Sequence, residues 1–204
     1  MSKRILISAS ILLILFIILA ILTTTGQLAT MDKTVSAAVH SLETPALTTV
    51  LLVITTAGEW FVYVLIILVL LLIPKLRWKV GLPVAITMVV DVALNWGLKQ
   101  LFAIPRPDTH RLITETGFSF PSGHAMSIAA FIGLIVFLYI RYSDKERRQT
   151  AQTTVVLVLA ALLILAVGFS RIYLGVHNLS DIMAGYAMGF FLSLLTLGVL
   201  DIIE

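Results

Sequence analysis

Long apolar segments alternate with short polar connections over most of the chain. Several of these segments approach the roughly 20 apolar residues that an α-helix needs to cross a bilayer. The pattern predicts six transmembrane helices, at about Ile5–Leu22, Gly58–Ile73, Val80–Leu101, Ser122–Ile140, Thr153–Phe169 and Leu179–Leu200. We therefore expect an all-α integral membrane protein that forms a single domain over residues 1–204.

The first apolar segment has two interpretations. It follows Lys3 and Arg4, as the apolar stretch of a signal peptide does. However, it is longer than the usual apolar region of such a peptide, and no clear small-x-small cleavage site follows between Thr23 and Ala29. An uncleaved membrane anchor is therefore favoured over a cleaved signal.

The longest connection, residues 23–57, joins the first two predicted spans. Apolar residues recur at helical spacing between Asp32 and Leu42, which predicts a short interfacial helix in this loop. Pro45 suits the first turn of a second helix. Gly58 and Glu59 are placed to bend that helix into the second span.

Composition agrees with a membrane protein. Hydrophobic residues make up 59% of the chain and charged residues 12%, about half the charged share of a soluble domain. The mean hydropathy is +1.06. There are no cysteines, which excludes disulfides and cysteine-based metal sites. The net charge of +3 is small and requires no nucleic-acid partner.

The distribution of Lys and Arg predicts the orientation in the membrane. With the N-terminus inside, nine of the 14 lie inside and five outside (9 + 5 = 14). The inside set is Lys3, Arg4, Lys75, Arg77, Lys79, Arg141, Lys145, Arg147 and Arg148, and the outside set is Lys33, Lys99, Arg106, Arg111 and Arg171. Three of the outside residues belong to the motifs described next, so the remaining bias is nine against two. Both termini are therefore expected in the cytoplasm and the motifs at the extracytoplasmic face.

The first motif is Lys99-x6-Arg106-Pro107. Lys99 lies near the end of the third predicted span, and Arg106 lies in the loop that follows, between two stiffening prolines. A lysine point charge and a bidentate guanidinium suit a phosphate group. The alternative is a pair of cations that snorkel at a helix end.

The second motif is Pro121-Ser-Gly-His124, at the start of the fourth predicted span. Ser122 suits the N-cap position, and Gly123 lets a ligand approach the backbone. Amides at a helix N-terminus, with the helix dipole behind them, form an anion site. His124 on the first turn is placed to donate a proton to a leaving oxygen. The alternative is an ordinary serine cap with an incidental histidine.

The third motif is Ser170-Arg171-x5-His177-x3-Asp181, in the connection between the last two spans. The four-residue spacing places His177 and Asp181 on one helical face if the last span begins early. A carboxylate on one imidazole nitrogen fixes the tautomer and frees the other nitrogen as a nucleophile. Arg171 adds a third cation. The alternatives are a salt-bridged loop or a metal pair, and no metal is expected because the nearby cations would repel a divalent ion.

A polar stripe precedes the first motif. Asp91, Asn95 and Lys99 follow one another at four-residue steps and share one face of the third span. Asp91 has two interpretations. It belongs to a buried network that supports Lys99, or it makes a hydrogen bond to a neighbouring helix.

Charged residues near a bilayer are costly, so a cluster of them indicates function. Together the three motifs place two histidines, a carboxylate and three cations on one membrane face. Phosphoryl transfer needs positioning and charge stabilisation above all, which three cations and a helix N-terminus supply. The cluster therefore favours hydrolysis of a phosphate ester.

The three motifs resemble those of the type-2 phosphatidic acid phosphatase family, which also includes vanadium haloperoxidases and glucose-6-phosphatase. All three family motifs are complete here, and the six-span layout extends the resemblance over most of the chain. The resemblance implies a phosphatase that needs neither metal nor cofactor. By this resemblance, His177 forms a phosphohistidine, Asp181 orients it, and His124 protonates the leaving alkoxide and later activates water.

The resemblance also implies that the phosphoryl oxygens are held by Lys99, Arg106 and Arg171, with the backbone at Ser122 and Gly123. A site at the boundary between membrane and water suits a lipid substrate. The family implies phosphatidylglycerol phosphate, phosphatidic acid or undecaprenyl diphosphate, and the short loops resemble those of a small bacterial member.

Two alternative functions remain open from the sequence. A lipid phosphotransferase would pass the phosphoryl group to an acceptor other than water. A binding or transport protein for anionic lipids would use the cations for capture alone, which leaves His124 and the pair His177–Asp181 unexplained. The expected partners are the bilayer and a lipid phosphate, and nothing in the sequence indicates an oligomeric state.

Overall fold

The computed structural model describes residues 3–144, 146 and 150–203, and over this part of the chain it contains helices and loops but no strand. The all-α prediction is therefore confirmed. Lys145, Arg147 and Arg148, which the orientation argument uses, lie outside the described residues. The helices are α1 (Lys3–Thr24), α2 (Ala29–His40), α3 (Pro45–Thr56), α4 (Trp60–Leu72), the π-helical turn η1 (Arg77–Gly81), α5 (Leu82–Phe102), α6 (Gly123–Tyr142), α8 (Ala151–Tyr173) and α9 (Leu179–Ile203).

Five helical segments are long and apolar enough to cross a membrane: α1, η1 with α5, α6, α8 and α9. Helices α2 and α3 pass the same test only as a pair, and they are bent by 119° at their junction. The second span expected from the sequence is α4, which has 13 residues and a length of about 20 Å. The helical nature of each expected span is confirmed, and the count of six spans stays a prediction.

The two helices of the long first loop form close to their predicted positions. Helix α2 begins at Ala29, three residues before the predicted start at Asp32. Helix α3 begins at Pro45, and Thr44 caps it through a bond from the amide of Leu47. Helix α4 follows the bend at Gly58 and Glu59, as expected. The position of α2 relative to the bilayer stays a prediction.

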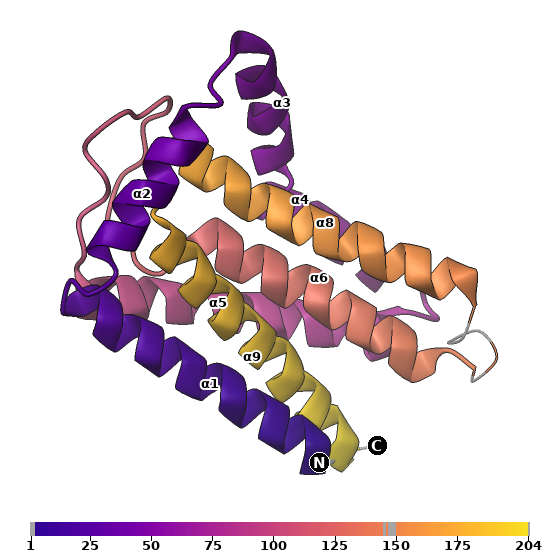
Figure 1. Ribbon diagram of the computed structural model, residues 1–204. Coiled ribbons are helices and arrows are strands. Elements are labelled where there is room, and N and C mark those ends of the chain that lie inside the picture. Colours follow the sequence, from indigo (N-terminus) through magenta and orange to yellow (C-terminus); the bar gives the residue numbers. More distant parts are fainter. Residues whose placement is uncertain (1–2, 145, 147–149, 204) are drawn as a thin grey trace.

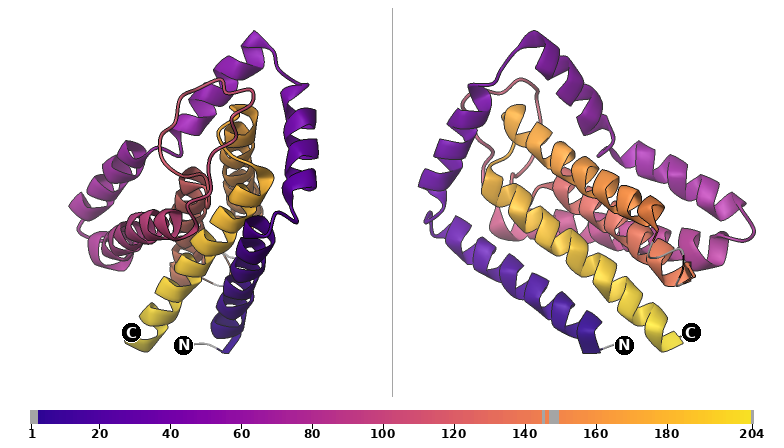
Figure 2. Two further views of the ribbon diagram at one scale, coloured as in Figure 1. Left: turned by 90° about the vertical axis from the view of Figure 1, so that its left-hand side faces the viewer. Right: turned by 45° about the vertical axis from the view of Figure 1, so that its right-hand side comes forward.

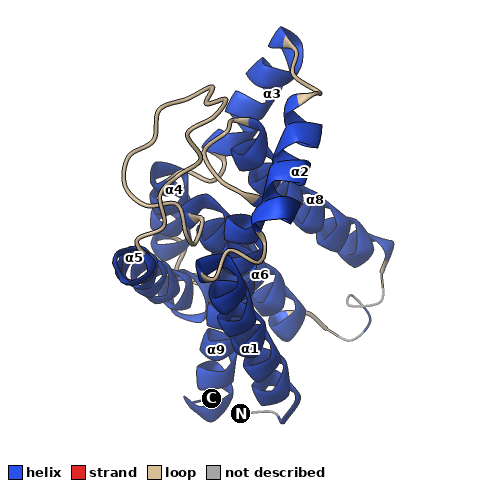
Figure 3. Ribbon diagram, turned by 60° about the vertical axis from the view of Figure 1, so that its left-hand side comes forward, coloured by secondary structure: helices blue, strands red, loops and turns tan. Residues whose placement is uncertain are grey.

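The helices form an elongated bundle with two distinct ends. Helices α1 and α9 lie side by side and antiparallel, so that both termini lie at one end (Figure 1). Helix α2 and the long loop 103–122 lie at the other end, as two further views agree (Figure 2). Loop segments gather there above the helix ends (Figure 3). The three motifs belong to this loop-rich end.

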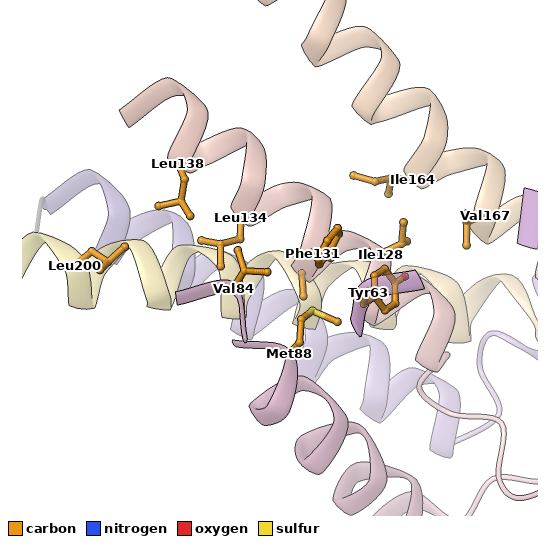
Figure 4. Packing of buried hydrophobic residues seen from close by; sticks show 11 residues of the cluster. Tyr63, Val84, Met88, Ile128, Phe131, Leu134, Leu138, Ile164, Val167 and Leu200 are labelled. Carbon is orange, nitrogen blue, oxygen red and sulfur yellow. The ribbon is translucent and has the colours of Figure 1, made fainter. Parts of the chain in front are cut away.

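Helix α6 lies at the centre of the bundle and contacts α5, α8 and α9. One face packs in a hydrophobic cluster with α4, α5, α8 and α9 (Figure 4). The residues of this cluster labelled in Figure 4 are Tyr63, Val84, Met88, Ile128, Phe131, Leu134, Leu138, Ile164, Val167 and Leu200. A second cluster joins α6 and α9 to α1.

The close packing of α6 and α9 depends on glycine. A Cβ atom on Gly189 would lie 2.2 Å from the backbone oxygen of Met126, so a side chain there would force the helices apart. Where α6 and α9 begin, the backbone amide of Ser122 donates to the backbone oxygen of Asp181 over 3.1 Å. This packing places the second motif directly beside the third.

Candidate active site

The first residue of the site is His177, in the connection before α9, with a side chain that is 2% exposed. Its Nδ1 lies 3.3 Å from Oδ2 of Asp181 and 3.2 Å from Oγ of Ser119. Ser119 in turn donates to the same carboxylate oxygen over 2.5 Å. Because both neighbours accept from Nδ1, this nitrogen carries the imidazole proton.

The other nitrogen of His177 faces a cation. Its Nε2 lies 3.0 Å from Nη1 of Arg106. A guanidinium only donates hydrogen bonds, so Nε2 is the acceptor and keeps its lone pair. The tautomer expected of a histidine nucleophile is therefore fixed from both sides of the ring.

The charge state of His177 suits the same role. Burial lowers the pKa of His177 to about 4, although the hydrogen bond to Asp181 opposes this shift. The ring is therefore neutral at neutral pH. Asp181 also accepts from the amide of Asn178 over 2.8 Å, which holds its carboxylate in place.

Arg106 is fixed in the loop by several backbone oxygens. Its Nε and Nη2 donate to Thr116 over 3.2 and 3.1 Å, and its Nη1 donates to Val176 over 3.1 Å. Burial lowers the pKa of Arg106, and the charge of Glu115 opposes this shift. The loop therefore holds the guanidinium with one edge toward His177.

Arg171 lies at the end of α8 with a side chain that is 1% exposed. Its Nη1 donates to Oγ1 of Thr55 in α3 over 2.9 Å, and its Nη2 forms an ion pair with Glu115. Its Nε is buried and has no hydrogen-bond partner among the described residues. An unsatisfied buried donor on a cation is suited to a phosphoryl oxygen.

Glu115 is a part of the site that the sequence analysis missed. Its carboxylate pairs with Arg171 and lies 3.8 Å from Nη2 of Arg106. Although burial raises the pKa of Glu115, the two arginines outweigh that effect and hold it below its ordinary value. A carboxylate thus occupies the position between the cations where an anionic substrate would bind.

Lys99 supports the loop of the second motif. Its Nζ donates to the backbone oxygens of Phe118 and Ser119 over 2.5 and 3.1 Å. It also interacts electrostatically with Arg106, Asp181, Glu115 and Arg171, which places it in the same charged cluster. The first and third motifs are therefore brought together as expected.

The rest of the polar stripe on α5 faces α6. Asn95 donates to the backbone oxygen of Pro121 over 3.3 Å. Ser127 donates to Oδ2 of Asp91 over 2.5 Å, and Asp91 is fully buried. Asp91 therefore joins neighbouring helices, which favours the second interpretation given above over direct support of Lys99.

The second motif begins α6 as expected. Ser122 is the N-cap, and its Oγ accepts from the amide of Ala125 over 3.5 Å. The amide of Ser122 already donates to Asp181, so it is engaged in the fold before any phosphate binds. The phosphate contact through Gly123 stays a prediction.

His124 lies on the first turn of α6. Its Nε2 is 3.3 Å from Oε1 of Glu59, at the bend between α3 and α4. The ring interacts electrostatically with Arg171, Glu115 and His177, so it belongs to the same cluster as the other two motifs.

An apolar groove of about 810 Å³ leads to His124 between α4 and α5. Its walls include Trp60, Ile67, Met88 and Val92, and its polar end includes Glu59 and His124. The groove therefore connects the lipid-facing side of the bundle with the second motif.

Three further residues that the sequence analysis did not assign to the site support it: Asp32, Glu59 and Ser119. Asp32 in α2 accepts from the amide and the hydroxyl of Ser180, over 2.9 and 2.7 Å, at the start of α9. Ser119 and Glu59 contact His177 and His124. None of these residues has a diagnostic spacing, and Ser119 alone lies close to a motif. Within the described part of the chain, no group of three or more His, Asp or Glu side chains is arranged to hold a metal ion.

Comparisons with known proteins identify the family of this chain. The family model described as the PAP2 superfamily matches residues 78–201. The chain is 31% identical over 193 residues to phosphatidylglycerophosphatase B of Bacillus subtilis, covering 92% of each protein. It is 28% identical over 148 residues to an undecaprenyl-diphosphatase of Sulfolobus acidocaldarius, covering 70% of this chain and 65% of that protein.

Two solved structures are similar to this fold. The crystal structure of a transmembrane PAP2-type phosphatidylglycerolphosphate phosphatase from Bacillus subtilis matches with a TM-score of 0.86 and 28% identity, covering 97% of this chain and 98% of that one. LpxE of Aquifex aeolicus shares the fold, with a TM-score of 0.66 and 20% identity, covering 82% and 95%. From the matched residues and the first relative, we conclude that the chain belongs to the PAP2 superfamily and is a phosphatase.

Proposed function

We propose that this protein is a metal-independent lipid phosphatase that hydrolyses lipid phosphomonoesters or diphosphates through a phosphohistidine at His177. The observation that carries this proposal is the fixed tautomer of His177. Its Nδ1 proton is held by Asp181 and Ser119, and its Nε2 lone pair faces the cation of Arg106.

The reaction follows from these contacts. The substrate phosphate takes the place of the Glu115 carboxylate between the arginines and draws Arg106 away from Nε2 of His177. The freed lone pair attacks phosphorus, and His124 gives a proton to the leaving oxygen. Water then cleaves the P–N bond. Lys99, Arg106 and Arg171 stabilise the charge on the phosphoryl oxygens in both steps.

The apolar groove supports a lipid as substrate. A lipid whose phosphate meets the arginines can lay its chains between α4 and α5, because the groove has apolar walls and ends at His124. The names of the relatives favour phosphatidylglycerol phosphate first and undecaprenyl diphosphate second. Phosphatidic acid has the same phosphomonoester chemistry.

The proposed site faces the extracytoplasmic side. The bias of nine cations against two supports this orientation. The termini lie at the end of the bundle opposite the motifs (Figure 1), which is consistent with it. Because the chain has no cysteine, single cysteine substitutions test this orientation directly. A membrane-impermeant maleimide added to intact cells should label Thr109→Cys and not Lys75→Cys, and the reverse result would overturn the orientation.

The decisive experiment measures phosphate release in detergent micelles with EDTA, from a panel of lipid mono- and diphosphates. The wild-type protein is compared with His177→Ala and with His110→Ala as a matched control outside the three motifs. We expect release by the wild type and the control and none by His177→Ala. No release by any variant, equal release by all three, or a strict need for added divalent metal would contradict the proposal. Transfer of phosphate to a second lipid would indicate the phosphotransferase instead.

A further inference from the structure

A second carboxylate–imidazole pair lies across the site from His177 and Asp181. The Nε2 atom of His124 is 3.3 Å from Oε1 of Glu59. The His124 side chain is 16% exposed and that of Glu59 is 36% exposed. Glu59 lies before residue 78, where the match to the family model begins, so neither the motifs nor the family model points to it.

The bend between α3 and α4 is shaped to bring Glu59 to this ring. A Cβ atom on Gly58 would lie 2.8 Å from Cδ2 of His124 and 3.0 Å from Cγ1 of Val167. Only a residue without a side chain lets the backbone pass so close to the imidazole. The backbone at the bend therefore packs against the edge of the ring that carries Nε2, and the next residue presents its carboxylate to that nitrogen.

We propose that Glu59 is a positioning residue for His124, and that it assigns the acid–base chemistry of this histidine to Nδ1. An ionised carboxylate only accepts hydrogen bonds, so the Nε2 that faces it carries a proton. Among the described residues, Nδ1 of His124 has no hydrogen-bond partner. The inference rests on the proposed function, because it concerns the acid and base of that reaction.

Both halves of the reaction balance with this assignment. In the first half, the Nδ1–H of the His124 imidazolium gives its proton to the leaving oxygen. The P–O bond breaks with its electron pair on oxygen, and the bond between phosphorus and Nε2 of His177 forms. In the second half, Nδ1 takes a proton from the attacking water. The P–N bond then breaks with its electron pair returned to His177. Glu59 stays ionised and keeps the Nε2–H bond throughout, as the carboxylate does in a serine protease triad.

The surroundings explain why His124 needs this partner. Arg171 and His177 also interact electrostatically with the ring, and a cation such as Arg171 repels a positively charged imidazole. Glu115 opposes that effect, but substrate phosphate would displace it from Arg171. Glu59 is not paired with either arginine of the site, so its charge remains beside His124 during the reaction. It also lines the polar end of the apolar groove, from which the leaving oxygen of a lipid would approach.

The test uses the dependence on the leaving group, which a purely structural role would not change. Glu59→Gln keeps the shape and removes the charge, and Glu43→Gln is the matched control, because Glu43 pairs with His110 outside the motifs. First-turnover rates are measured in micelles for a short-chain phosphatidic acid and for p-nitrophenyl phosphate. A nitrophenolate leaves without protonation, whereas an alkoxide needs it.

We expect Glu59→Gln to slow the first turnover of phosphatidic acid about 10- to 100-fold and that of the aryl ester less than about threefold. The control should match the wild type on both esters. An equal loss on both esters, or no loss on either, would overturn the inference. An inactive wild type, or an active His177→Ala in the same assay, would instead overturn the proposed function.

A spectroscopic measurement tests the assignment without activity. In ¹⁵N-histidine NMR of the wild-type protein, the resonances of His124 are identified by their loss in His124→Gln. At a pH where the ring is neutral, we expect the Nε2–H tautomer in the wild type and in Glu43→Gln, and a mixture of tautomers in Glu59→Gln. An Nδ1–H tautomer in the wild type would overturn the inference even if Glu59→Gln reduced activity.

Discussion

At the scale of single residues, the site is held in a resting arrangement by its own charges. Arg106 covers the lone pair of His177, and Glu115 bridges the two arginines. These contacts satisfy buried charged groups that would otherwise be costly, and a phosphate satisfies the same groups better because it offers more acceptor oxygens. Under the proposed function, substrate binding is expected to replace these internal partners instead of filling a ready-made site.

Ser119→Ala tests the support of the nucleophile. The substitution removes the donor to Asp181 and the second acceptor for Nδ1 of His177, so the ring loses part of its orientation. We expect kcat to fall about 10- to 100-fold, the range found when the partner that orients a metal-binding histidine is removed, because Ser119 orients His177 in the same way. Ser41→Ala, at an exposed serine directly after α2, should have no effect. Phosphate release at saturating lipid measures both, and unchanged kcat in Ser119→Ala would exclude this role.

The low pKa of His177 predicts how the stability of the protein depends on pH. Burial lowers it from 6.5 to about 4, so the folded protein stays neutral at this ring while the unfolded chain takes up a proton. Because the unfolded state binds more protons in this range, stability should fall as the pH falls from 6.5 to 4. Ring ¹⁵N shifts against pH follow the group directly. A midpoint near 6.5 for His177 would contradict the prediction.

At the scale of elements, the site depends on how helix starts are brought together. Asp32 of α2 holds the start of α9 through Ser180, and Ser122 at the start of α6 bonds to Asp181. Helix α2 therefore supports the third motif. Glycine in α9 allows α6 to approach closely enough for these bonds to form.

A pair of glycine substitutions measures the importance of that packing. Gly189→Ala would place a methyl group against the backbone of α6, and overpacking of this kind costs about 1–3 kcal/mol. Gly97→Ala is the control, since nothing lies within 4 Å of its added Cβ, and alanine favours a helix by about 1 kcal/mol over glycine. Thermal unfolding in detergent should show a lower Tm for Gly189→Ala and an equal or higher one for Gly97→Ala. The same Tm for both would indicate that the two helices adjust freely.

At the scale of the whole molecule, the charged end and the apolar groove together select a substrate. The cations of the three motifs gather at one end of the bundle, and the groove between α4 and α5 runs from His124 along the apolar sides of the helices. A molecule with a phosphate and long apolar chains satisfies both surfaces. A soluble phosphate ester satisfies only the first.

A bulky side chain in the groove should separate the contribution of the groove to substrate binding from that of the charged end. Ala93 lines the groove, and Ala93→Phe would displace roughly two methylenes of a bound chain, each worth about 0.8 kcal/mol. We expect the KM for a long-chain lipid phosphate to rise about tenfold, since 1.4 kcal/mol corresponds to a factor of ten. The KM for a short-chain soluble phosphate ester should not change. Val90→Phe, exposed on the same helix outside the groove lining, is the control. An equal rise for both substrates would argue against lipid binding in the groove.

Local signals in the sequence determined the elements and the motifs. The six apolar segments became helices within a few residues of their expected ends, because hydrophobic length, proline positions and caps act over one or two turns. The three motifs were recognised for the same reason, since each is a short segment with its own spacing. His177 lies two residues before α9 and Asp181 lies in its first turn, so their contact is local in the chain, and the family match confirms the phosphatase.

Tertiary structure alone decided which residues complete the site. Ser119 reaches Asp181 across 62 positions, Glu59 reaches His124 across 65, and Asp32 reaches Ser180 across 148. A common polar residue in a loop has no spacing that distinguishes it from a solvated one, so no local pattern marks these partners. Only the packing of helices, which depends on the sum of many apolar contacts over the whole chain, brings them within hydrogen-bonding distance.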